Sequence, residues 1–371
     1  MSLLLGKWQR KISTNKSKIK TLSKFEIRFF SVGNSKKGGD AILIRLYDPQ
    51  DNPTVILVDG GYSDNGQEIL DYLSECGLDK IDLVVNTHPD MDHVSGLITI
   101  FKDENIKISK LLLNRPWRDA NLKVTYFEDG RITEKSLNKK LTESFKQAYQ
   151  LEQLAIRKIG ENNIVHPVRG NVYFEVLKII GPSTNLYRKR LLASDKTPTS
   201  SIADSMRVFS RKVLKFVRYV KGTFIGWIEG ENTSDINETS IVMALSLPNY
   251  KFLFTGDVGK EGLKEALDYY ETFEGCQAKD FTHMQIPHHG SRKNLNPTLI
   301  KRIGATTYYV SCPPDGFSEG HPSKRLINKI KQIYPGAYIY YTKNGWLSHF
   351  NNLQIGGSPA DSYPVFEEID I

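Results

Sequence analysis

Short apolar stretches separated by amphipathic ones run along most of the chain. Toward its start, stretches rich in β-branched and aromatic residues predict strands at 25–33, 41–48, 54–61, 81–88 and 108–115. The last two are almost continuously apolar, which is typical of strands buried on both faces. Apolar residues at helical spacing predict helices over 65–76 and 135–160.

The rest of the chain continues this alternation of strands and helices. It predicts strands at 171–182, 239–247, 250–257, 281–290, 306–312 and 337–342, and helices at 260–273, 297–303 and 323–333. Two groups of strands, with helices between and outside them, indicate an α/β (α+β) fold. We expect the layers to form an αββα sandwich.

Three segments differ from this pattern in their composition. Residues 1–24 are rich in lysine and predict a flexible basic arm, while residues 358–371 form a short tail with acidic residues. Residues 183–236 carry many Arg and Lys side chains among scattered aromatics, and we interpret them as a basic insertion, helical over 202–220. The chain from 25 to 357, with this insertion, is expected to form one domain.

Charge and cysteine content narrow the choice of partners and compartment. The net charge is +8 and the isoelectric point about 9.1, which suits nucleic acid or another anionic partner, or simply a solubilising surface. Three cysteines without a paired spacing argue against a disulfide framework and favour a reducing, cytoplasmic setting. No stretch approaches the roughly 20 apolar residues that span a bilayer, so no membrane partner is expected.

The strongest chemical signal follows the predicted strand at 81–88. Thr87-His88-Pro89-Asp90-Met91-Asp92-His93 places four possible metal ligands within six positions, namely His88, Asp90, Asp92 and His93. Imidazole and carboxylate groups together suit zinc, manganese or iron. The alternative is a polar turn whose His and Asp residues only cap the next helix.

Two further motifs also stand at strand ends. Asp257 ends the apolar stretch FLFTGD, where a buried carboxylate needs compensation by a cation or serves as a helix cap. His288 and His289 end the stretch MQIPHHGS, and adjacent side chains of this kind point in different directions. We expect one of the two to bind metal and the other to hold substrate or donate a proton.

Weaker candidates surround these motifs. His321, in Gly320-His321-Pro322-Ser323, is expected either to contact substrate phosphate or assist proton transfer, or to be a plain helix-start residue. Asp59 ends a strand and is expected to brace the metal loop or to form a simple turn. The remaining polar candidates are interpreted as local hydrogen-bond formers (Asn237 and Ser240) or as structural histidines (His166, His283 and His349).

These motifs, in this order, resemble the metallo-β-lactamase superfamily, and within it the soluble relatives of ComEC-type competence proteins. The matching segments are FFSVGNSKKGGDAILI, ILVDGG, THPDMDHVSGL, NETSIVMALS, FLFTGD, IPHHGS and GHPS, across about residues 25–345. The resemblance implies a hydrolase domain with two adjacent divalent metals, zinc or manganese. It assigns His88 and Asp90 to one metal, Asp92 and His93 to the other with His288 or His289, and Asp257 to both.

The chain departs from the broad superfamily in two ways. Asp90 stands where most members have histidine, and this harder ligand makes manganese more plausible relative to zinc. No counterpart of the usual middle histidine lies between the first motif and Asp257; His166 falls in that interval but precedes a variable-looking strand.

The expected chemistry is hydrolysis by a metal-activated water. Asp92 or Asp257 is expected to accept the proton of the water, and His289 or His321 to protonate the leaving group. The favoured function is a phosphodiesterase, and in particular a nuclease on DNA or RNA, given the net charge and the basic segments. The alternatives are a small-molecule hydrolase for a lactone, thioester or lactam, and an effector or binding subunit active only with a protein partner.

Overall fold

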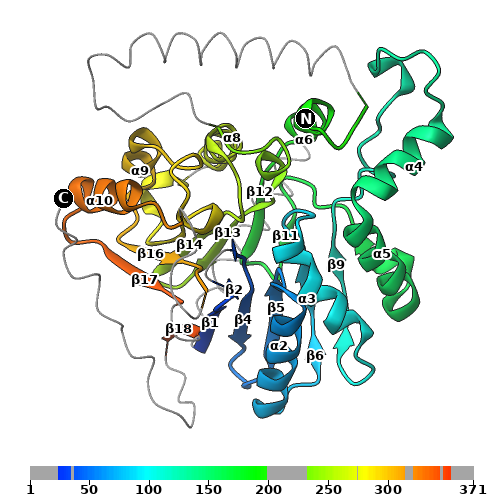
Figure 1. The fold of residues 1–371 in the computed structure, drawn as a ribbon. Helices are drawn as coiled ribbons and strands as arrows, with labels where there is room; N and C mark the ends of the chain where they lie inside the picture. The colour runs from blue at the N-terminus through cyan, green and yellow to red at the C-terminus, as the bar shows by residue number, and fades with distance from the viewer. Residues whose placement is uncertain are drawn as a thin grey trace, which may run out of the picture.

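Two sheets packed face to face, with helices outside each, form the molecule (Figure 1). The computed structural model describes residues 24–34, 37–198, 232–273, 275–313, 321–342 and 346–351. Almost all of the predicted basic arm, the helix expected at 202–220 and the predicted tail lie outside the described residues, so the expected domain boundaries stay a prediction.

The first sheet holds seven strands in the order β10-β9-β7-β5-β4-β1-β18. Neighbouring strands are antiparallel along the row β18-β1-β4-β5. Strands β5, β7, β9 and β10 run parallel to one another. Their bounds are β1 Lys24–Phe30, β4 Ile42–Tyr47, β5 Pro53–Val58, β7 Leu83–Val85, β9 Leu111–Leu112, β10 Ile164–Val165 and β18 Trp346–Asn351. The short pairs β2–β3 (Gly33–Asn34, Lys37–Gly38) and β6–β8 (Lys80–Ile81, Lys107–Ile108) stand beside this sheet.

The second sheet also has seven strands, in the order β11-β12-β13-β14-β15-β16-β17. The strands from β14 to β17 are parallel, so that their carboxyl ends meet at one edge. The bounds are β11 Val172–Tyr173, β12 Leu177–Gly181, β13 Val242–Leu247, β14 Tyr250–Phe254, β15 His283–Gln285, β16 Thr307–Val310 and β17 Tyr338–Tyr341.

Helices cover the outer face of each sheet. Those on the first sheet are α2 Ser63–Glu75, α3 Met91–Lys102, α4 Glu134–Ser144 and α5 Lys146–Ile159. Those on the second are α8 Lys260–Tyr270, α9 Pro297–Ile303 and α10 Lys324–Ile333. Helix α6 (Thr184–Ala193) lies within the predicted insertion, at its start. No helix among the described residues has the length and apolar content needed to cross a membrane.

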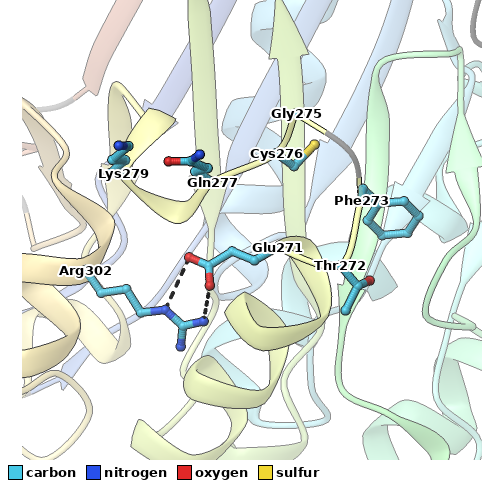
Figure 2. Close-up of a pocket in the computed structure, with 8 residues that line it drawn as sticks. All are labelled: Glu271, Thr272, Phe273, Gly275, Cys276, Gln277, Lys279 and Arg302. Atoms are coloured by element: carbon cyan, nitrogen blue, oxygen red, sulfur yellow. Dashed lines mark hydrogen bonds and ion pairs between the residues drawn. The ribbon is translucent and has the colours of Figure 1, made fainter.

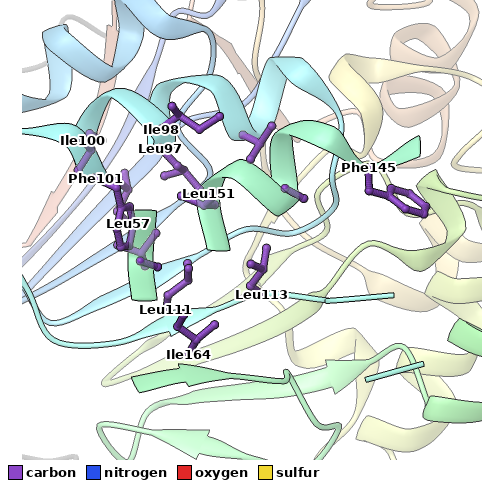
Figure 3. Packing of buried hydrophobic residues seen from close by; sticks show 14 of the residues in the cluster. Leu57, Leu97, Ile98, Ile100, Phe101, Leu111, Leu113, Phe145, Leu151 and Ile164 are labelled. Atoms are coloured by element: carbon purple, nitrogen blue, oxygen red, sulfur yellow. The ribbon is translucent and has the colours of Figure 1, made fainter. Parts of the chain in front are cut away.

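Three apolar layers follow from this arrangement. One lies between the sheets, where Phe29 of β1 stacks on Tyr309 of β16 with ring centroids 4.6 Å apart. The other two lie beneath the outer helices; Figure 3 shows part of one of them, with Leu97 of α3, Leu151 of α5 and Leu111 of β9 in the same cluster. The alternation within strands and helices therefore separates inner and outer faces as the αββα prediction requires.

The structure differs from the predicted elements in two places. The helix expected over 135–160 is two helices, because Phe145 leaves helical geometry (φ −113°, ψ 38°) and its ring is buried in the outer layer of the first sheet. Strand β18 was not predicted. It pairs antiparallel with β1, its partner more than 300 residues away in sequence, so local pattern gives little sign of it.

Candidate metal centre

Three loops that follow strands meet at one edge of the two sheets. The loop after β7 carries His88 and continues into α3, the loop after β14 carries Asp257, and a tight turn after β15 carries His288 and His289. Backbone hydrogen bonds join these loops: His288 N–H donates to the Gly256 carbonyl at 3.1 Å, and Ile241 N–H donates to the Thr87 carbonyl at 3.1 Å. The second bond links the two sheets at this edge.

The carboxylate of Asp257 stands at the middle of the cluster. Its Oδ2 lies 3.7 Å from His88 Nε2 and 3.6 Å from His288 Nε2. Its Oδ1 lies 3.5 Å from His93 Nε2 and 3.8 Å from His289 Nε2. One carboxylate therefore faces two pairs of imidazoles, one pair with each oxygen.

Two further carboxylates complete the pairs. Asp90 Oδ2 lies 3.6 Å from His88 Nε2, whereas Asp92 Oδ2 lies 3.7 Å from His93 Nε2 and 3.5 Å from His289 Nε2. We call His88, Asp90 and His288 the first half of the centre, and Asp92, His93 and His289 the second half, with Asp257 shared. All seven residues predicted as metal ligands are thus brought together. Of the two residues left open for the second half, His289 lies there and His288 lies in the first.

The outward nitrogens of the first motif's histidines are held by hydrogen bonds. His93 Nδ1 lies 2.8 Å from Asp59 Oδ2. His88 Nδ1 lies 3.1 Å from the hydroxyl of Thr87, and that hydroxyl donates its own proton to Asp59 at 2.5 Å, so it can only accept from the imidazole. Both rings therefore carry the proton on Nδ1 and turn the lone pair of Nε2 into the centre. Asp59 lies where the sequence suggested a brace for the metal loop.

Asn294 also contacts the outward nitrogen of His288. Its amide nitrogen donates to the carbonyls of Asp257 and Val258, at 2.8 and 3.1 Å, so its Oδ1 is the atom turned toward His288 Nδ1, at 3.3 Å. The amide nitrogen of Asn237 lies at the same distance from His288 Nδ1, 3.3 Å, so polar groups hold this nitrogen while Nε2 faces Asp257. His289 Nδ1 in turn lies 3.7 Å from Asp40 Oδ1.

The inward-facing atoms suit a cation better than any partner the protein provides. Nε2 of His88, His93 and His289, and Oδ1 of Asp257, are buried without a hydrogen-bond partner among the described residues. Buried polar atoms left in this way are costly, and divalent ions held by the two halves would satisfy them. Imidazole and carboxylate donors of this kind hold zinc or manganese. The residues therefore fit the metals that the sequence implied.

Charge in the centre leads to the same conclusion. Burial is the largest influence on Asp257 and would raise its pKa, but His288, His289 and His93 together hold the pKa of Asp257 well below its ordinary value. Burial likewise opposes charging of His289, but Asp257, Asp40 and Asp92 outweigh it and raise the pKa of His289 to about 9. The cluster of carboxylates thus attracts positive charge, which protons or cations can supply.

Backbone strain accompanies the paired histidines. His288 and His289 both have a left-handed backbone, with φ of 52° and 53°, a conformation that costs energy for residues other than glycine. This turn directs the two adjacent rings into different halves of the centre. Glycine at position 38 leaves room for one of them, because a Cβ there would lie 3.2 Å from Cγ of His289.

Several residues of the site were missed by the sequence interpretation. Asp40 is buried, accepts a hydrogen bond from Gln285 at 2.9 Å, and offers a ligand atom within 4.8 Å of those of His93, Asp257 and His289. Asn237, interpreted as a local hydrogen-bond former, donates to Asp257 Oδ2 at 3.3 Å. The sequence signal for Asp40 is weak: an acid between two glycines and a predicted strand.

The remaining histidines occupy different surroundings. The ring of His321 lies 5.1 Å from that of His288, and burial together with the charges of His288 and His289 lowers the pKa of His321 to about 4. His166 Nδ1 lies 3.7 Å from Asp119, and His283 stacks on Phe252 with centroids 4.4 Å apart. The side chain of His349 lies outside the described residues.

A separate surface depression of about 620 Å³ lies at the end of α8 (Figure 2). Glu271 and Arg302 form an ion pair of 2.6 Å in its lining, which also includes Lys279. None of its lining residues belongs to the centre.

Comparison with known proteins finds a family model that matches part of the chain. Residues 37–139 match the model of the metallo-beta-lactamase superfamily. The matched range includes His88, Asp90, Asp92 and His93. No curated protein matches the chain in sequence.

Three solved structures are distantly similar. A protein from Thermotoga maritima described as a metallo-beta-lactamase is 12% identical, with 63% of this chain and 78% of that one covered and a TM-score of 0.30. A variant of the CmlA beta-hydroxylase is 10% identical (87% and 53% covered, TM-score 0.41), and a long form of RNase Z from yeast is 9% identical (88% and 41% covered, TM-score 0.40). The chain spans about half of the hydroxylase and less of RNase Z. These likenesses are too distant to bear on the reaction.

The division into halves predicts how cation content responds to mutation. We expect His288→Ala and His289→Ala each to lower cation binding by one ion per chain, because each removes a ligand from one half. His88→Ala combined with His288→Ala should lose no more than either alone, whereas His88→Ala combined with His289→Ala should lose both ions. Elemental analysis and the spin-coupled manganese resonance of the dialysed proteins measure this. Equal losses in the two double variants would contradict the assignment.

Proposed function

We propose that the chain is a metal-dependent phosphodiesterase of the ComEC-type branch, acting as a nuclease on DNA or RNA. The observation that carries the proposal is the position of Asp257, whose two oxygens face separate sets of ligands. The residues of the two halves would hold a pair of cations through this shared carboxylate, and such a pair would suit hydrolysis of a phosphodiester. The net charge of +8 suits a polyanionic substrate.

The protein groups around the centre have distinct tasks in this proposal. Divalent cations supply two effects there: they make water acidic enough to act as a nucleophile near neutral pH, and they offset charge on phosphoryl oxygens. Asp92 has a side chain 24% exposed, against 3% for Asp257, so of the two expected proton acceptors Asp92 has the better access to water.

The expected proton donors also differ in position. His289 turns Nε2 into the centre, 3.5 Å from Asp92, which favours its role as a ligand. His321 is half-buried beside His288 and is left as the group that contacts phosphate or the leaving oxygen. The choice of cation follows from Asp90, which adds an oxygen donor and makes manganese more plausible relative to zinc.

A direct assay tests the proposal. Purified protein is incubated with single- and double-stranded DNA and RNA, and with bis-p-nitrophenyl phosphate, in the presence of manganese or zinc. We expect cleavage with manganese, its loss after chelation, and its return when manganese is restored. Failure to cleave any of these substrates with any metal, by protein whose circular dichroism shows it folded, would count against the proposal.

Two other results would redirect the assignment. Hydrolysis of a lactone, thioester or lactam, but of no phosphodiester, would make the chain a small-molecule hydrolase. Cleavage that appears only when a copurifying protein is added would make it the catalytic or effector subunit of a complex.

A further inference from the structure

Two segments on the outer side of the second sheet border the metal centre. One continues from His289 through Ser291 to Lys293, and the other runs from His321 into α10. Ser323 N–H donates to the Gly290 carbonyl at 2.9 Å, which ties the two segments together. The rings of His288 and His321 lie 5.1 Å apart across the same junction.

This border carries exposed positive charge. Lys293, Lys324 and Arg325 are all exposed, and within the described part of the chain none of the three has a carboxylate within ion-pair distance. Lys293 is close enough for its charge to help lower the pKa of His321, after the larger effects of burial and of His288 and His289. We call these three residues the basic rim.

The other side of the centre has the opposite charge. Helix α2, on the first sheet, starts just after Gly61, whose N–H donates to the Asp40 carbonyl at 2.9 Å. Four acidic residues along one side of this helix line a depression of about 630 Å³: Asp64, Glu68, Asp71 and Glu75. Arg28 is the one cation in that lining, and its charge partly offsets the rise that burial causes in the pKa of Glu68, so acidic groups outnumber basic ones there by four to one. A polyanion is repelled there and attracted over the basic rim.

We propose that the phosphate backbone of a nucleic acid strand leaves the metal centre across the basic rim of Lys293, Lys324 and Arg325, away from α2. This inference rests on the proposed function, which it deepens by giving the substrate a direction. The contacts are with phosphates, so they are the same for DNA and RNA and carry little sequence preference. Figure 1 shows α2 and α10 on opposite layers of the sandwich, which separates the two charged sides.

The test compares matched pairs of exposed helical cations. Lys324→Ala/Arg325→Ala removes two rim charges, and Lys135→Ala/Lys140→Ala removes two from α4; alanine is compatible with both helices. Binding of fluorescent single-stranded DNA and RNA oligonucleotides is measured by anisotropy with chelator present, from low to high salt. We expect the rim variant to reduce the salt slope by about 1.4, because a single strand contributes about 0.7 per phosphate contact. At 0.1 M salt the same relation raises Kd roughly fivefold per contact.

The outcomes separate this inference from the proposed function. A rim variant with the Kd and salt slope of the parent, or of the α4 control, would overturn the inference. So would a parent that cleaves bis-p-nitrophenyl phosphate but binds no oligonucleotide, and in that case the proposed hydrolysis would stand. If the protein binds oligonucleotides through the rim but cleaves no phosphodiester, the proposed binding surface is supported and the proposed activity is overturned. Binding of DNA alone, or of RNA alone, through the rim identifies which strand it holds.

Discussion

Asp257→Asn is expected to abolish hydrolysis and to lower the cation content of both halves together. The substitution preserves the shape of the side chain but removes the charge that faces four imidazoles at 3.5–3.8 Å. Loss of an outer partner of a metal ligand typically costs about 10–100-fold in affinity or activity. Loss of a donor common to both halves should exceed the upper end of that range. Elemental analysis and the bis-p-nitrophenyl phosphate assay measure the two effects.

A matched control separates this effect from a general loss of charge. Asp280→Asn changes a carboxylate that pairs with Lys251 at 3.3 Å, at the far end of the same sheet, and should leave cation content and activity unchanged. Circular dichroism and gel filtration should show both variants folded. If Asp257→Asn kept its full cation content, the proposed shared carboxylate would be wrong.

Glu26→Gln is expected to lower the free energy of unfolding by about 3–5 kcal/mol, the usual cost of breaking a buried ion pair on one side. The carboxylate is fully buried and accepts from Arg45 Nε at 2.6 Å and from Arg28 Nε at 3.2 Å. The hydroxyls of Tyr72 and Ser348 each donate to it at 2.9 Å. The neutral amide leaves two buried guanidinium groups without their counter-charge.

Denaturant unfolding measures this loss, and a surface pair provides the comparison. Asp79 and Lys107 form an ion pair of 2.6 Å with side chains 70% and 72% exposed, so Asp79→Asn should leave the denaturation midpoint close to that of the parent. Equal midpoints for Glu26→Gln and the parent would show that the buried network contributes nothing measurable to stability.

The convergence of the three motifs could be predicted from the sequence. Each motif follows an apolar strand, and in layered α/β folds such strand ends collect at one edge. The αββα layers were predictable for a related reason, since alternation within strands and helices shows which faces are apolar. The domain match over residues 37–139 agrees with the superfamily that the motifs resemble, whereas the ComEC-type branch stays a prediction.

The division of labour within the site could not be predicted. Whether His288 or His289 enters the second half depends on two consecutive left-handed residues, and nothing in the letters His-His specifies such a backbone. Asp40 and Asn294 are short polar residues in loops, where most such residues serve turns. The sequence offers no counterpart of the usual middle histidine between the first motif and Asp257. In the structure, His288 from the last motif supplies an imidazole to the first half.

Pairing of β1 with β18 has a consequence for how the chain folds. Phe25 lies opposite Asn351, so the two strands meet only after almost everything between them has been synthesised. A nascent chain therefore emerges with the backbone groups along one side of β1 unsatisfied and with Glu26 lacking the hydroxyl of Ser348. Since contacts between such distant segments form slowly, closure of the first sheet belongs to the last stage of folding.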